Sequence, residues 1–139
     1  MKIICFDPGT VRIGVAISDE TAYLARPVGN IKNDERLERF LKELSEKEPF
    51  DAIVVGNPLN MDGTKNPKTI HADKLAETLG RVFPGKDITM WDERLSSREA
   101  EELMINADLS RKKRKKKVDS LAAVIILQGY LDHARARKK

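Results

Sequence analysis

Short apolar runs, each bounded by a turn or a charged residue, dominate the first part of the chain. One run covers residues 1–6 and ends at Asp7, and a second covers 13–18 after the sequence Pro-Gly-Thr-Val-Arg. Short runs that are apolar on both faces are typical of central strands. Because Pro-Gly favours a tight turn, we expect these strands to form a hairpin with Asp7 at its mouth. A weaker pattern at 23–31 predicts a third strand that completes a meander.

The rest of the chain alternates between helical and strand patterns. From Asn33, a good N-cap residue, apolar side chains recur at helical spacing as far as Pro49. The later elements that we expect are a strand at 51–56, a loop at 57–67, a helix marked by residues 72–82, a strand at 88–91, a helix capped by Ser96 with an apolar face at 100–107, and a last helix over 118–131. This order predicts an α/β fold with a mixed five-stranded sheet, in which an antiparallel meander adjoins parallel strands and helices cover both faces.

The length of 139 residues fits one compact domain, residues 1–139. The N-terminus lacks the apolar stretch of a secretion signal, and no apolar run approaches the roughly 20 residues that cross a bilayer. We therefore expect a soluble, cytoplasmic protein with no membrane partner. Cys5 lies in an apolar strand pattern and is expected to be a buried thiol without a catalytic role. His71 and His133 lack metal-ligand spacing and are expected at the surface.

Positive charge is concentrated in two stretches, although the net charge is only +4. Residues 111–117 are seven consecutive Lys and Arg residues, and four more lie within 135–139, so the remainder is acidic. Such runs bind polyanions, either nucleic acid or an anionic membrane surface. Taken alone, a solvated lysine-rich loop explains the first run equally well. Its position favours nucleic acid, because it joins the last two expected helices immediately before Asp119, beside the acidic residues described next.

Acidic residues occur where three of the expected elements begin or end. Asp7 ends the first strand, Asp92 and Glu93 end the fifth, and Asp119 lies in the first turn of the last expected helix. Since sites in such sheets form beyond the carboxyl ends of the strands, these acids are expected to converge. Clustered carboxylates repel one another unless a cation is present, and Mg²⁺ or Mn²⁺ is the simplest candidate. Two such ions about 4 Å apart can hydrolyse a phosphodiester.

Each acid also has a structural explanation. Asp7 could cap the Pro-Gly turn, Asp119 could be favoured by the helix dipole, and Asp92 or Glu93 could pair with Arg94. Individually these explanations are at least as good as a metal site. Jointly they lose ground, because three independent element ends would have to carry acids on one rim by chance.

Four blocks of the sequence are similar to the YqgF family of pre-16S rRNA nucleases, which are also described as Holliday junction resolvase-like. The blocks are FDPGTVRIGVAISD at 6–19, VVGNPLNMDGT at 54–64, WDERLSSREAEE at 91–102 and KVDSLAAVIILQGYL at 117–131. The resemblance covers nearly the whole chain and implies an RNase H-like fold, divalent-metal phosphodiester hydrolysis, and roles for Asp7, Glu93 and Asp119 as catalytic and metal-binding acids. Asn57 departs from an apolar residue of that pattern and Asn66 from a common glycine, which leaves the substrate preference more open than the catalytic set.

Further residues are expected at this site, beside the acids from the first strand and the last helix. Adjacent strand residues point to opposite faces, so only one of Asp92 and Glu93 can face it, and we favour Glu93 for its longer side chain. Arg94 is expected to contact phosphate, with a salt bridge to its acidic neighbours as a nearly equal alternative. The residues expected to hold the phosphate backbone are Arg111, Lys112, Lys113, Arg114, Lys115, Lys116 and Lys117. Because aromatic residues are absent from this run, we expect recognition of shape rather than sequence.

Several functions fit this pattern. We expect a nuclease acting on structured RNA or branched DNA, with 5′-end maturation of precursor 16S rRNA favoured through the resemblance and Holliday junction resolution as the alternative. A monomer or weak homodimer is expected. A non-catalytic nucleic-acid-binding module would bind without cleaving. An actin-like ATPase is disfavoured, because 139 residues provide only one of its two lobes.

Overall fold

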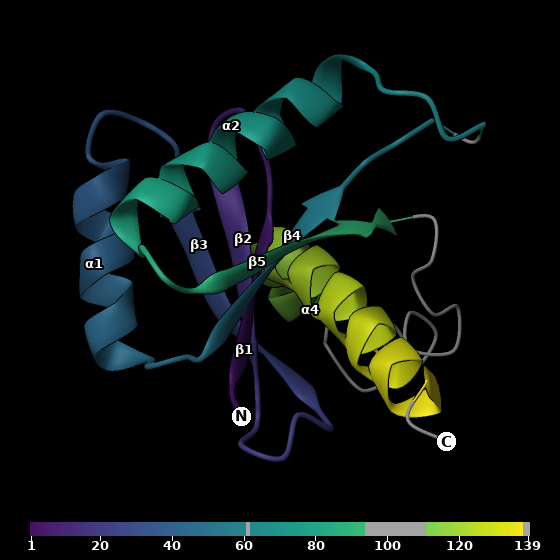
Figure 1. Ribbon diagram of the computed structural model, residues 1–139. Coiled ribbons are helices and arrows are strands. Elements are labelled where there is room, and N and C mark those ends of the chain that lie inside the picture. Colours follow the sequence, from purple (N-terminus) through teal and green to yellow (C-terminus); the bar gives the residue numbers. More distant parts are fainter. Residues whose placement is uncertain (61, 94–110, 138–139) are drawn as a thin grey trace.

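The protein consists of a five-stranded sheet with helices on both faces (Figure 1). The computed structural model describes residues 1–60, 62–93 and 111–137. In chain order the elements are β1 (Ile3–Asp7), β2 (Arg12–Ser18), β3 (Ala25–Lys32), α1 (Leu37–Lys47), β4 (Ala52–Asn57), α2 (Pro67–Val82), β5 (Asp87–Asp92) and α4 (Arg111–Arg137). The strand order in the sheet is β3-β2-β1-β4-β5.

The sheet is mixed, as the sequence predicts. β1 pairs antiparallel with β2, with Asp7 opposite Gly14, and β2 pairs antiparallel with β3. These pairings confirm the hairpin and the meander. β1 and β4 are parallel, as are β4 and β5, so the carboxyl ends of these three strands lie at one edge.

Two separate cores lie on the two faces, because successive side chains of a strand point to opposite sides. On one face, Ile4 and Phe6 of β1 pack with α1 and α2. On the other, Ile3 and Cys5 pack against α4. Figure 1 shows α1 and α2 on one side of the sheet and α4 on the other, which confirms the predicted layers. Cys5 is fully buried, as expected.

Two helix starts differ from the prediction. The N-cap of α1 is Arg36 and not Asn33. Asn33 instead donates from Nδ2 to the Gly9 carbonyl oxygen at 2.7 Å, and its backbone N–H donates to the Val11 carbonyl oxygen at 2.8 Å. Asn33 is therefore used to tether the β1–β2 turn. α2 begins at Pro67, earlier than the apolar spacing indicates, because Asn66 caps it and proline is favoured at the first helical position.

The predicted loop at 111–117 is wrong, since these residues begin α4. Lysine and arginine are good helix formers, and the apolar part of the same helix gives it a packed end to extend from. Asp119 consequently lies in the third turn of α4 rather than the first, so the helix dipole does not explain it. The helix expected from Ser96 lies outside the described residues. In the described part of the chain, none of the helices combines the length and apolar character needed to cross a membrane.

Candidate active site

Two carboxylates meet at the carboxyl edge of the parallel strands. Asp7 ends β1, and Glu93 directly follows β5, whose last residue Asp92 is opposite Asn57 of β4. Asp7 and Glu93 both line a pocket of about 350 Å³. The remaining lining residues come from the β1–β2 turn, the end of β4 and the start of α2: Pro8, Gly9, Thr10, Pro58, Lys68 and His71. The strand pairing thus joins residues that are far apart in sequence.

The Glu93 side chain is partly buried and hydrogen-bonded to Asp7. Burial raises the pKa of Glu93, because the charged form loses its hydration. The hydrogen bond with Asp7 and the positive charge of Lys68 lower this pKa, while the charge of Asp92 raises it, and burial is the largest of these effects. A carboxylate in this setting is stabilised by a cation.

Gly56 provides the room that Glu93 occupies. A Cβ atom at this position would lie 3.3 Å from Glu93 Oε1 and 2.9 Å from Ile126 Cδ1 on α4. The glycine therefore lets both the Glu93 carboxylate and α4 approach the end of β4 closely. Any larger side chain here would displace one of them.

Oxygen donors dominate this edge of the sheet. Besides the two carboxylates, the Oδ1 atom of Asn57 is buried and accepts no hydrogen bond from the described residues. Carboxylate and amide oxygens are the ligands that Mg²⁺ and Mn²⁺ prefer, so the donor set fits such an ion. No group of three or more His, Cys, Asp or Glu side chains that could hold a metal occurs among the described side chains. The side chain of Asp119 lies outside that set.

Sequence reasoning missed Lys68 and His71, which line the pocket from the first turns of α2. His71 is partly exposed and lines this pocket, whereas His133 is exposed as expected. The sequence feature that could have located both residues is Asn66-Pro67, an N-cap followed by proline. It starts α2 early enough to bring Lys68 and His71 to the site.

The residues predicted to contact nucleic acid are less fully described. Arg94 lies outside the described residues, and the run from Arg111 to Lys117 forms the first turns of α4 without described side chains. Asp92 is adjacent to Glu93 in the sequence, but it is not among the described residues that line the pocket.

The sheet order, with helices on both faces, is that of the RNase H-like fold. The fold is shared with RuvC of T. thermophilus, solved in complex with a Holliday junction substrate, at a TM-score of 0.67 and 15% identity, covering 99% of this chain and 96% of that one. The fowlpox virus resolvase, solved with Holliday junction DNA, matches at a TM-score of 0.62 and 15% identity over 96% of this chain and 99% of that one.

The chain belongs to the RuvX family, described as Holliday junction resolvase, whose family model matches residues 1–133. Curated relatives from Bacillus thuringiensis (strain Al Hakam) and Bacillus anthracis (strain A0248) carry the name "Putative pre-16S rRNA nuclease". Each is 46% identical over 136 residues, covering 95% of this chain and 98% of the relative. The resemblance and the RNase H-like fold predicted from the four sequence blocks are confirmed.

Proposed function

We propose that this protein is a divalent-metal-dependent nuclease that hydrolyses phosphodiesters in structured nucleic acid, with precursor 16S rRNA as its substrate. The observation that carries the proposal is the hydrogen-bonded pair of Asp7 and Glu93 in one pocket at the carboxyl edge of the sheet. Membership in a family of nucleases supports it.

Asp7, Glu93 and Asp119 are the proposed metal ligands. Two Mg²⁺ or Mn²⁺ ions bound there would supply an activated water and stabilise the leaving oxygen. Asp119 is included because it precedes Ala123 by four residues and Ile126 by seven, and residues at these spacings share one helix face. Ala123 is fully buried against the sheet, and Ile126 Cδ1 is the atom nearest to a Cβ at Gly56.

The remaining pocket residues are suited to hold the substrate. Lys68 is an exposed cation whose charge already acts on Glu93, and it stands in the first turn of α2, where the helix dipole favours anions. We therefore assign it a contact with the phosphate that is cleaved. Arg94 and the basic start of α4 would hold flanking phosphates of the backbone. Glu93 is preferred to Asp92 as the acid from β5 because only Glu93 lines the pocket in the described residues.

The decisive experiment offers a precursor 16S rRNA fragment and a four-way DNA junction to the purified protein, each with Mg²⁺ and with Mn²⁺. We expect metal-dependent cleavage of the RNA, abolished in Asp7→Asn. Junction cleavage alone would assign the protein to recombination, as the family description and the two resolvase structures suggest for their members. Binding of either substrate without cleavage would identify a non-catalytic module.

A further inference from the structure

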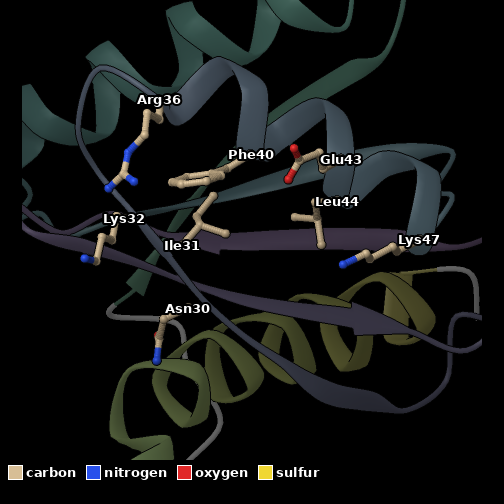
Figure 2. Close-up of a pocket in the computed structure, with 8 residues that line it drawn as sticks. All are labelled: Asn30, Ile31, Lys32, Arg36, Phe40, Glu43, Leu44 and Lys47. Carbon is tan, nitrogen blue, oxygen red and sulfur yellow. The ribbon is translucent and has the colours of Figure 1, made fainter.

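A second pocket, also of about 350 Å³, lies between α1 and the end of β3 (Figure 2). Its floor is apolar and consists of Ile31, Phe40 and Leu44. Basic side chains flank this floor, and Figure 2 shows Lys32 and Arg36 on one side of the Phe40 ring and Lys47 on the other. We call these six residues the α1–β3 groove. An apolar floor between cations suits a ligand that is flat in one part and anionic in another.

The Phe40 ring is the part of the groove best suited to a flat group. Phe40 is only partly buried, while Leu44, one turn further along α1, is buried. The guanidinium carbon of Arg36 lies 5.2 Å from the centroid of the Phe40 ring. The guanidinium carbon of Arg39 also lies over this ring, at 5.4 Å from its centroid. An aromatic ring that already stacks with guanidinium groups can take a nucleobase in place of one of them, since every base has a π-face.

The charges of the groove complement a phosphate backbone. Lys32 and Lys47 contribute two positive charges, while the charge of Arg36 is paired with Asp34 at 2.8 Å, and Glu43 is the acid in the lining. Glu43 is itself 3.8 Å from Arg39, which reduces its effect on an anion in the groove. The groove therefore attracts anions.

The groove adjoins the proposed active site through the β1–β2 turn. Gly9 and Thr10 of this turn line the acidic pocket. Asn33, directly after Lys32, donates to the Gly9 and Val11 carbonyl oxygens, and Arg12 is opposite Lys32 in the β2–β3 pairing. A nucleic-acid strand that leaves the acidic pocket over this turn meets the groove next.

We propose that the α1–β3 groove binds an unpaired nucleotide of the nuclease substrate, with its base on Phe40 and the adjoining phosphates against Lys32 and Lys47. The proposal rests on the nuclease function given above and narrows the substrate to nucleic acid with a single-stranded extension beside the cleaved bond. A fully paired four-way junction offers no free base to this groove.

An acidic peptide added as a strand to the edge of β3 is the competing occupant. Strand addition needs a row of free backbone groups along the edge. On β3, Pro27 has no N–H to donate, and the Ala25 N–H already donates to Gln128 Oε1 at 2.9 Å. Only the start of β3 is blunted in this way, so an added peptide strand would find pairing groups along part of the edge, and the nucleotide is favoured because it needs none of them.

The test measures binding in an Asp7→Asn background, so that the RNA survives. The probe is fluorescein-labelled single-stranded oligoadenylate, and a fully paired four-way DNA junction serves as the comparison ligand. Phe40→Leu keeps the apolar volume and removes the stacking face. Lys32→Gln/Lys47→Gln removes two charges of the groove. Lys42→Gln/Lys74→Gln is the matched control, because it removes two exposed lysines that do not line the groove.

We expect Phe40→Leu to weaken oligoadenylate binding at least about fivefold and to leave junction binding unchanged. The groove pair should weaken oligoadenylate binding and reduce the salt slope by up to roughly 1.4 units, whereas the control pair should change both far less. If Phe40→Leu does not fold, the groove pair decides alone. Parental affinity in the groove variants, or preferential capture of a polyglutamate peptide, would overturn the proposal.

Failure of the groove and failure of the nuclease assignment are distinguishable. Cleavage by the wild type is measured separately with the precursor RNA. Cleavage with parental binding in the groove variants rejects the groove alone. Loss of binding in those variants by a protein that never cleaves supports the groove and rejects the nuclease.

Discussion

The acidic pocket and the α1–β3 groove lie on either side of one turn, but they differ in charge, burial and place in the sheet. The pocket brings together Asp7, at the end of the central strand β1, and Glu93, directly after the edge strand β5, and burial raises the pKa of Glu93. The groove carries two exposed lysines, Lys32 at the end of the edge strand β3 and Lys47 at the end of α1.

The difference between them follows from what each must do. Reactive charges act most strongly where water is excluded and neighbouring strands fix their positions. A nucleic-acid backbone is attracted by exposed cations that need no fixed geometry. The partly buried carboxyl ends of the parallel strands therefore suit the chemistry, and the exposed groove between α1 and β3 suits binding.

The largest expected effect is on cleavage, when a proposed metal ligand in the acidic pocket is removed. Asp7→Asn, Glu93→Gln and Asp119→Asn should each lower cleavage on the order of 1000-fold, because each removes a ligand of the proposed ions. The measurement is single-turnover cleavage with Mg²⁺ at saturating substrate, with melting temperatures to show that each variant is folded. Wild-type rates in all three folded variants would end the assignment.

Asp92→Asn tests which of the two adjacent acids, Asp92 or Glu93, is the metal ligand. Since Asp92 acts on Glu93 through its charge and does not line the pocket in the described residues, its loss should be much milder than that of Glu93. The two amide variants are compared in one cleavage assay. A more severe defect in Asp92→Asn would mean that the other face of β5 carries the ligand.

The basic start of α4 can be compared directly with the groove. Replacing Lys112, Lys113, Lys115 and Lys116 by Gln should make the salt slope of binding shallower by up to roughly 3 or 4 units for duplex substrates of unrelated sequence. Cleavage at saturating substrate should change far less, because no proposed ligand is altered. Salt titrations in the Asp7→Asn background measure this, and an unchanged slope would show that the run makes no phosphate contact.

The burial of Glu93 should also affect the stability of the folded protein, with a smaller effect than those described above. Because the pKa of Glu93 is raised in the folded protein, the native state holds this proton to a higher pH than the unfolded chain does. Stability is therefore lost as pH rises through the window between the ordinary and the raised pKa. In metal-free buffer, Glu93→Gln should melt at a higher temperature than wild type above this window and equally below it.

Thermal unfolding at several pH values, with a chelator present, checks the sign. Added Mg²⁺ should favour wild type over the variant, because an ion that binds only the folded state stabilises it. A variant less stable than wild type throughout the metal-free series would contradict the burial argument.

Sequence patterns were sufficient for the sheet and for the acidic edge. Continuous apolar runs identify β1, β2 and β4, and parallel strands end at one edge, which is why Asp7 and Glu93 could be paired beforehand. The starts of the helices were harder to predict, because local hydrogen bonds determine which residue becomes the N-cap. Asn33 has the composition of a cap yet bonds to the β1–β2 turn, and Asn66 caps α2 instead.

The α1–β3 groove could not be predicted in this way. Phe40 and Leu44 have the spacing of an ordinary core-facing helix, and only the position of α1 beside the sheet edge leaves the Phe40 ring partly uncovered. The basic run was misassigned for a related reason. Its charges were taken as typical of a loop, although lysine is compatible with a helix that is held by packing at its other end.

α4 covers one whole face of the sheet and also contains Asp119, and this coupling has a consequence for folding. Until this helix docks, the apolar face that includes Ile3, Cys5 and Val54 remains in water. The same docking step would bring the third proposed acid to the other two if Asp119 is a metal ligand as proposed. A chain in which α4 has not docked would therefore expose an apolar, aggregation-prone face and would also lack one of the proposed metal ligands.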